Sequence, residues 1–165
     1  MATQQIQTAT SKQVKLLEVI RDVCSQMNEL PFGHGMRSYA NIDDRQDLRT
    51  GIYDNEKMFP RAFLYPYLVN DLINAAGMVE CSYECAMDFL TECKLNDNQI
   101  ILEERMYEMF MLSSKFIYLL AQHKDVVAKE FKNIERKPNY HIYDANLCGF
   151  ELTFSIKLKE DLQLC

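Results

Sequence analysis

The sequence contains few of the residues that mark disordered or low-complexity chains, since only five of its 165 residues are Gly and four are Pro. Apolar residues make up 48 % and charged residues 25 %, which is the balance of an ordinary globular protein. A chain of this length is about one domain long and can bury a hydrophobic core. We therefore expect a single domain over residues 1–165.

Long hydrophobic runs and a surplus of basic residues are also missing. The longest apolar stretches, such as AFLYPYLV at 62–69, are well short of the roughly 18 residues that cross a bilayer, and MATQQIQTATSKQ at the start has no apolar signal-peptide core. The net charge is −6, which disfavours a protein whose main task is to neutralise nucleic-acid phosphates. These features predict a soluble intracellular protein with no membrane partner.

Motifs of catalysis and cofactor binding are absent from the sequence. The histidines His34, His123 and His141 are far apart, and no HExxH, CxxC or paired Cys/His spacing occurs. No Ser-His-Asp or Cys-His spacing indicates nucleophilic catalysis. The segment PFGHG at 31–35 lacks the context of a phosphate-binding loop, so we interpret it as a helix stop followed by a mobile loop. The sequence thus predicts a protein that is not an enzyme and holds no cofactor.

The six cysteines do not resemble a secreted disulfide framework, because such scaffolds are smaller, denser in Cys and preceded by an export signal. Cys81, Cys85 and Cys93 share strand parity, so a metal site built from them stays open. Reduced core thiols are the simpler interpretation, because buried Cys commonly acts as a small apolar residue.

Two acidic clusters leave open an enzyme with a two-metal site, such as a nuclease. They are Asp43 with Asp44 and Asp47, and Glu103 with Glu104. Neighbouring carboxylates in polar loops and on the outer face of a helix are usually only solvated, and this is the interpretation that we prefer.

Apolar periodicity predicts two helices. Steps of three and four residues from Val14 to Met27 indicate an amphipathic helix that ends before Pro31, with Ser11 as its N-cap. After a cap at 96–98, a helix of about six turns is predicted. Its apolar stripe is Leu102, Met106, Met109, Ser113, Phe116 and Leu120. Tyr107, Met111, Ile117 and Tyr118 lie off this stripe, which indicates either an oligomer or a thicker core.

Strands are predicted around residues 57–69, 78–93, 140–144 and 150–158. The first is packed on both faces with Pro66 at a bulge, edge or end, and the second has a polar outer face. The last alternates strictly from Phe150 to Leu158. Residues 31–57 are predicted to form a long loop or ragged hairpin, residues 70–77 a connection, and residues 126–134 a short helix broken at 137–139. The fold class is therefore α+β, a mainly antiparallel sheet packed on one face by the N-terminal helix and the long central helix.

This order of elements resembles the tail-terminator and neck ring proteins of tailed bacteriophages. The resemblance runs from the N-terminal helix through a variable loop, a strand entered by Phe59–Leu64, the alternating strand Ser82–Cys93 and the helices to Tyr140–Asp144 and the closing strand. The ending Asn146–Ser155 is also similar to a closing strand in tail or collar proteins of phages of Bacteroides-type hosts, the crAss-like group among them. There the pattern is D-N-x-x-G-W-x-x-x-F, and here Phe150 takes the aromatic place.

The resemblance implies a tail-terminator-like fold and a structural virion protein, assembled in the host cytoplasm, that forms a sixfold or twelvefold ring in the neck or tail. Its partners would be copies of itself and adjacent portal, neck or tail ring proteins, with genomic DNA passing through the lumen. The net charge of −6 adds the expectation of a lumen that does not hold the DNA. The expected ring-interface residues are Arg37, Asp43, Asp44, Arg45, Asp47, Arg49, Tyr107, Met111 and Tyr118. A small intracellular adaptor or ligand-binding α+β domain is the alternative.

Overall fold

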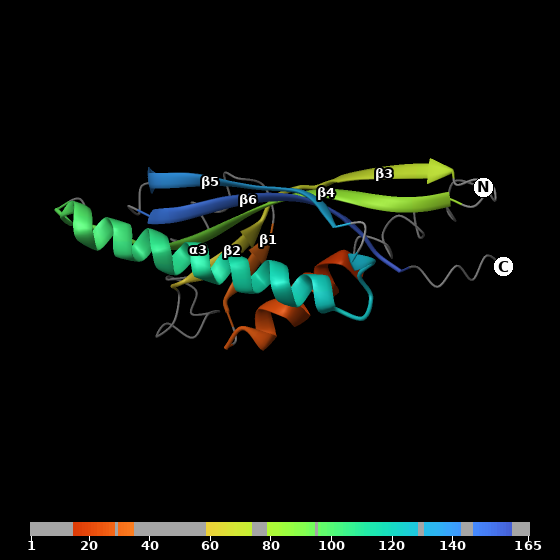
Figure 1. Cartoon of the computed structure of the whole chain (residues 1–165), viewed down its shortest axis with the longest axis horizontal. Helices are drawn as coiled ribbons and strands as arrows, with labels where there is room; N and C mark the ends of the chain where they lie inside the picture. The colour runs from red at the N-terminus through yellow and green to blue at the C-terminus, as the bar shows by residue number, and fades with distance from the viewer. Residues whose placement is uncertain are drawn as a thin grey trace, which may run out of the picture.

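A computed structural model describes residues 15–28, 30–34, 59–73, 79–94, 96–128, 131–142 and 147–159 of the chain. These residues form an α+β structure in which two helices accompany a six-stranded, mainly antiparallel sheet (Figure 1). The predicted fold class is confirmed at this level. The strands are β1 (Phe32–His34), β2 (Arg61–Leu64), β3 (Leu68–Ile73), β4 (Val79–Glu92), β5 (Lys132–Ile142) and β6 (Leu147–Lys157).

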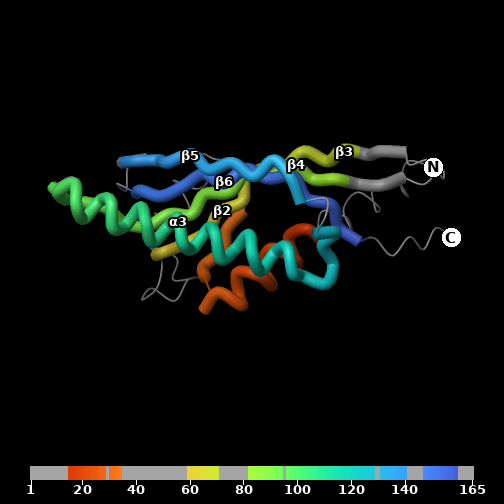
Figure 2. The backbone as a smooth tube through the Cα atoms, in the orientation of Figure 1, coloured from red at the N-terminus to blue at the C-terminus, as the bar shows by residue number. Residues whose placement is uncertain are grey.

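Strand β4 is the centre of the sheet, whose order is β1-β2-β4-β6-β5, with β3 paired to β4 as well. One edge of β4 pairs antiparallel with β2 along residues 87–90 and with β3 along residues 79–84. The other edge pairs with β6, from Ser82 opposite Lys157 to Glu92 opposite Leu147. Only β1 and β2 are parallel among the described pairs. Figure 2 shows β3 running beside β4 toward one end of the sheet and β5 beside β6 toward the other.

Helix α3 (Gln99–Gln122) begins and faces inward as its sequence predicts. The Oδ1 atom of Asn98 accepts a hydrogen bond from the backbone N–H of Ile101 at 3.0 Å, which makes Asn98 the N-cap. The residues of α3 that are buried belong to the predicted stripe: Met106, Met109, Ser113, Phe116 and Leu120. The N-terminal helix covers residues 15–26. The predicted cap of this helix, Ser11, lies outside the described residues.

One face of the sheet shares a core with both helices. The ring of Phe116 on α3 lies 5.2 Å from the ring of Phe89 on β4 and 6.2 Å from that of Phe154 on β6, measured between centroids. Leu16 and Ile20 of the N-terminal helix belong to the same buried cluster. Both helices lie on the same side of the sheet in Figure 1.

Strand β6 confirms the alternation predicted for the closing strand. Leu152, Phe154 and Ile156 are buried, whereas the intervening Thr153 and Ser155 are half-buried. Each buried residue contributes on the order of 1.5–3 kcal/mol to folding, so one face of this strand supplies much of the core.

The opposite face of the sheet is buried at β2, which corrects the polar outer face predicted for residues 78–93. Asp88 and Leu90 of β4 are fully buried on that face. Phe63 of β2 lies opposite Asp88, and Phe63 packs with Tyr65 in a second apolar cluster. The hydroxyl group of Tyr65 donates a hydrogen bond to the Asp88 carboxylate, which supplies the polar partner that a buried carboxylate needs. All four residues of β2 are buried, so the prediction of a strand packed on both faces is confirmed there.

The short helix predicted around residues 126–134 is wrong, because β5 begins at Lys132. The predicted break at 137–139 lies inside β5, where Pro138 pairs with Phe150 of β6. Among the described strands β5 has one neighbour, and an edge strand tolerates the missing N–H of a proline. Most of its side chains are exposed, so its sequence lacks the apolar alternation of a half-buried strand.

Two loop predictions also need correction. Strand β1 lies inside the segment predicted as a loop at 31–57, and it pairs with β2. The predicted connection at 70–77 begins within β3, which pairs with β4. Backbone pairing with another strand fixes both segments, and their own sequences do not show it. Pro66 lies between β2 and β3, at a strand end as predicted. Residues 35–58 lie outside the described part of the chain.

Gly149 provides a test of the β4–β6 register. A Cβ atom at Gly149 would lie 1.8 Å from the carbonyl oxygen of Phe89, which is a backbone atom that cannot move without shifting β4. At Gly33 a Cβ atom would lie 2.9 Å from the ring of Phe63, which can shift. We expect Gly33→Ala to lower the free energy of unfolding by roughly 1–3 kcal/mol, as overpacking does, and Gly149→Ala to lower it by more. Urea denaturation followed by circular dichroism measures both. Equal small losses would contradict the register.

Candidate functional site

The side of α3 turned away from the sheet carries exposed apolar side chains. Ile100, Tyr107, Met111 and Tyr118 are 67 %, 64 %, 50 % and 62 % exposed. At about 100° per residue they fall within roughly 40° of one another and roughly 150° from the centre of the buried stripe. We call these four residues the outer stripe. Large exposed apolar side chains gathered on one face commonly mark a binding surface.

Three residues of the outer stripe, Tyr107, Met111 and Tyr118, were predicted to lie off the main stripe, and their exposure confirms that placement. Their part in a ring interface stays a prediction. Ile117 is half-buried against the main core and does not belong to the outer stripe. Ile100 was not among the predicted residues, although it lies seven residues before Tyr107 and that spacing places both on one side of a helix.

The outer stripe is mounted on a helix that β5 and β6 hold in place. The guanidinium group of Arg136 on β5 donates hydrogen bonds to the Oγ atoms of Ser113 and Ser114, each at 3.1 Å. The same group lies 4.8 Å from the ring centroid of Phe110, a cation–π arrangement. Phe110 also contacts Phe150 of β6 edge-on, with ring centroids 6.0 Å apart. These contacts give the outer stripe the rigid support that a recognition surface needs.

The charged candidates lie elsewhere in the chain. The predicted interface residues Arg37, Asp43, Asp44, Arg45, Asp47 and Arg49 all lie outside the described residues. Of the second acidic cluster, Glu103 and Glu104 are exposed on α3. Glu103 accepts a hydrogen bond from the Nε2 of Gln99 at 2.9 Å.

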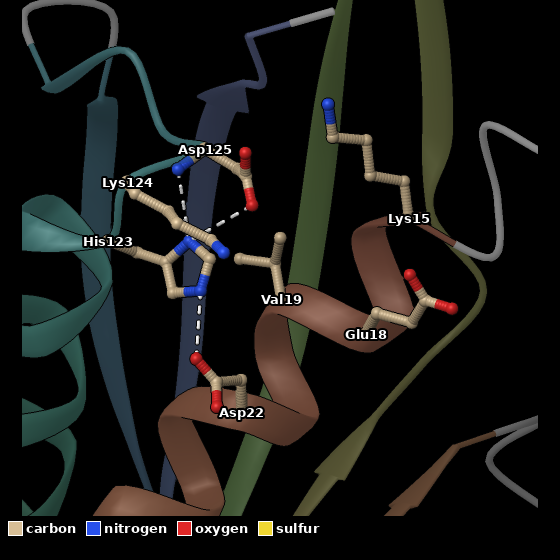
Figure 3. A pocket seen from close by; sticks show the side chains of 7 residues that line it. All are labelled: Lys15, Glu18, Val19, Asp22, His123, Lys124 and Asp125. Atoms are coloured by element: carbon tan, nitrogen blue, oxygen red, sulfur yellow. Dashed lines mark hydrogen bonds and ion pairs between the residues drawn. The ribbon is translucent and has the colours of Figure 1, made fainter.

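A hollow of about 440 Å³ lies between the N-terminal helix and the C-terminal end of α3 (Figure 3). His123, the C-cap residue of α3, points into it toward Asp22 of the N-terminal helix. The Nδ1 of His123 accepts a hydrogen bond from the backbone N–H of Asp125 at 3.2 Å. In the neutral ring the proton is therefore on Nε2, which lies 3.0 Å from the Oδ2 of Asp22 and donates to it.

The residues that line this hollow make contacts between segments of the fold, and their arrangement does not indicate catalysis. Both ring nitrogens of His123 already have partners, so neither is directed at a substrate. The lining residues carry charges of both signs, and none of those described is a Ser, Thr or Cys that the histidine could activate. The ammonium group of Lys15 donates to the carbonyl of Lys159, and that of Lys159 donates to the carbonyl of Lys124 at 2.8 Å. These contacts tie the segment after β6 to the N-terminal helix and to the turn that follows α3.

The three cysteines for which a metal site was left open do not all belong to one cluster. Cys85 belongs to the main core, whereas Cys93 packs with Cys148 and Met106 in a separate cluster, and the side chain of Cys81 is outside the described part. Burial raises the pKa of Cys24 to about 12, and burial together with a neighbouring Cys93 charge raises that of Cys148 to about 12. In the described ranges no three His, Cys, Asp or Glu side chains form a group that could hold a metal ion.

The helices seen in the described part of the chain do not include one that is long and apolar enough to span a membrane.

The hydrogen bond between His123 and Asp22 should contribute measurably to the stability of the fold. Replacing His123 with Ala removes a hydrogen bond that joins two segments and should lower the free energy of unfolding by on the order of 1 kcal/mol. Gln26→Ala is the matched control, because Gln26 also donates to Asp22, at 3.1 Å, but within the N-terminal helix. We expect the control to change stability by less than about 0.5 kcal/mol. Urea denaturation compares them, and equal effects would contradict a role for His123 in joining the helices.

The buried thiols predict slow alkylation of the folded protein. With iodoacetamide at pH 8, Cys24 and Cys148 should stay unmodified, because a pKa of about 12 leaves almost no reactive thiolate and burial closes access. Cys85, whose pKa burial also raises, should behave in the same way. Unfolding in urea should make all three reactive, as peptide mass spectrometry can show. Rapid modification before unfolding would contradict the packing.

Comparison with known proteins does not supply a relative. No protein-family model matches the chain, and no curated protein or solved structure matches it. The function must therefore be argued from the chemistry of the chain's own surfaces.

Proposed function

We propose that this protein is a structural subunit of a tailed-phage virion, which assembles into an oligomeric ring in the neck or tail, joins the portal or connector to the tail and lets DNA pass. The outer stripe of α3 is the observation that carries the proposal, because it gives a small domain an apolar surface with no partner in its own described fold. The resemblance in element order supplies the phage context.

The composition of the outer stripe suits contact with another protein. Tyr and Met are enriched in the centres of protein interfaces, and charged residues are depleted there. A helix that is apolar on two opposite faces has two packing partners. The sheet is the inner partner of α3, and in the proposal another subunit is the outer one.

A ring also needs a second contact surface, because a heterologous contact joins two different surfaces and an isologous pair closes at two copies unless another surface joins the pairs. The edge of β3 is the best second surface among the described strands. It carries the exposed Leu68 and Val69, and its ladder partner is β4. The β5 edge is less suited to pairing, because it contains Pro138 and two register irregularities.

The negative net charge of the chain is compatible with a ring around DNA. A lumen lined by fixed cations would bind phosphates and hold the DNA, whereas an acidic lumen would let it slide. With a net charge of −6, the proposed ring would line its channel mainly with acidic and neutral side chains.

A second candidate function, a small adaptor or ligand-binding domain, is favoured by the hollow beside His123. Its mixed charges would suit a small polar ligand. Such a domain could act as a monomer, so the state of association separates the two functions.

Sedimentation velocity tests the proposed function. We expect the wild-type protein to associate into species larger than the 19.3 kDa chain. Met111→Lys places a charge in the outer stripe and removes an apolar group whose burial is worth roughly 1.5–3 kcal/mol, so association should weaken by at least tenfold.

Tyr140→Lys is the control, because Tyr140 is a comparably exposed side chain at 55 % that lies on β5, outside the outer stripe. It should leave association unchanged. A wild-type protein that is strictly monomeric, or a Met111→Lys variant that associates as the wild type does, would contradict the proposed function.

A further inference from the structure

We propose that the outer stripe pairs with the outer stripe of a second copy in an antiparallel, two-fold arrangement whose axis passes between Met111 and Ser114. The inference rests on one part of the proposed function, namely that another copy covers this side of α3. It adds the orientation and register of the contact.

The spacing along the outer side of α3 is that of a helix-pairing seam. Residues at alternating steps of three and four continue the outer stripe from end to end, and such a pattern keeps one face of a helix turned toward a partner helix. They are Glu104, Tyr107, Met111, Ser114, Tyr118 and Ala121. The centre of this series is apolar or small, whereas its N-terminal end is acidic.

Only the antiparallel orientation keeps Glu104, at the N-terminal end of the series, away from a like charge on the second copy. With the axis between Met111 and Ser114, Tyr107 faces Tyr118 of the second copy, and Glu104 faces the small Ala121. A parallel pair in register would instead place Glu104 against its own copy. Two like charges facing each other at a contact are unfavourable, so the parallel pair is disfavoured.

The flanks of the seam are complementary in the same antiparallel register. On one side Glu108 faces Lys115 of the second copy, and the two-fold axis repeats that pair. On the other side Phe110 and Ile117 pack toward their own subunit, so they do not decide the orientation of the pair. A parallel pair would bring Glu103 opposite Glu108, both acidic. Opposite charges at the flanks commonly set helix orientation, and here they select the antiparallel pair.

A two-fold contact closes at two copies, so it cannot by itself build a ring. The pair then becomes the building unit, and a different surface, such as the β3 edge, must join the pairs. An assembly built this way contains an even number of subunits. Ile100 lies outside the paired part of the two helices. In this register it would face residue 125 of the second copy, which comes after the end of α3.

Thiol crosslinking tests the register in the full chain. Tyr107→Cys and Tyr118→Cys variants are made with Cys81 and Cys165 replaced by Ser, and a short bismaleimide is added to each variant alone and to an equimolar mixture. We expect the mixture to give crosslinked dimer at least five times as efficiently as either variant alone. Ile100→Cys, equally exposed, is the control and should give little product with itself.

The outcomes separate the inference from the proposed function. Efficient crosslinking of Tyr107→Cys with itself would overturn the antiparallel register and keep the interface. No crosslinking in any sample, with a wild-type protein that still associates, would overturn the pairing alone. No crosslinking together with a monomeric wild type would overturn both.

Charge reversal gives a second test that keeps the outer stripe intact. Glu108→Lys and Lys115→Glu should each weaken association several-fold, because each creates two like-charge contacts in the pair. The double variant should return to within about twofold of the wild type. These residues are two helical turns apart, so no direct contact within one helix explains such a rescue. A double variant as weak as the single ones would overturn the inference.

Discussion

The packing of Phe116 against Phe89 and Phe154 fixes the orientation of α3 on the sheet. That orientation determines which side chains of α3 are exposed at the surface. Because an α-helix turns by about 100° per residue, a helix anchored by one stripe must present the opposite side to the outside. The core contact that folds the domain therefore also sets out the outer stripe. Folding and association use opposite faces of one helix.

The sequence was most informative where a segment is long and packs on one side. The stripe of α3 runs from Leu102 to Leu120, about five turns, at regular steps, and its buried residues match the prediction. The closing strand was predicted equally well, because its buried residues Leu152, Phe154 and Ile156 alternate with half-buried ones. In both cases the apolar residues that recur at regular steps in the sequence are the ones that the fold buries.

Prediction failed where burial depends on residues that are distant in the chain. Asp88 looks like a solvent-facing residue of an alternating strand, yet Tyr65, 23 positions earlier, donates a hydrogen bond to it in a buried cluster. Strand β5 is held by its ladder with β6, and its exposed side chains carry no apolar alternation. The outer stripe itself was mostly visible in the sequence, but its alignment on one side of α3 needed the helix position to be known.

A density map of the purified assembly, at a resolution that shows side chains, tests most directly whether the outer side of α3 is covered by another copy. Our account predicts that Met111 is buried against α3 of a neighbouring subunit running in the opposite direction. An assembly whose subunits meet elsewhere, with Met111 left in solvent, would contradict it.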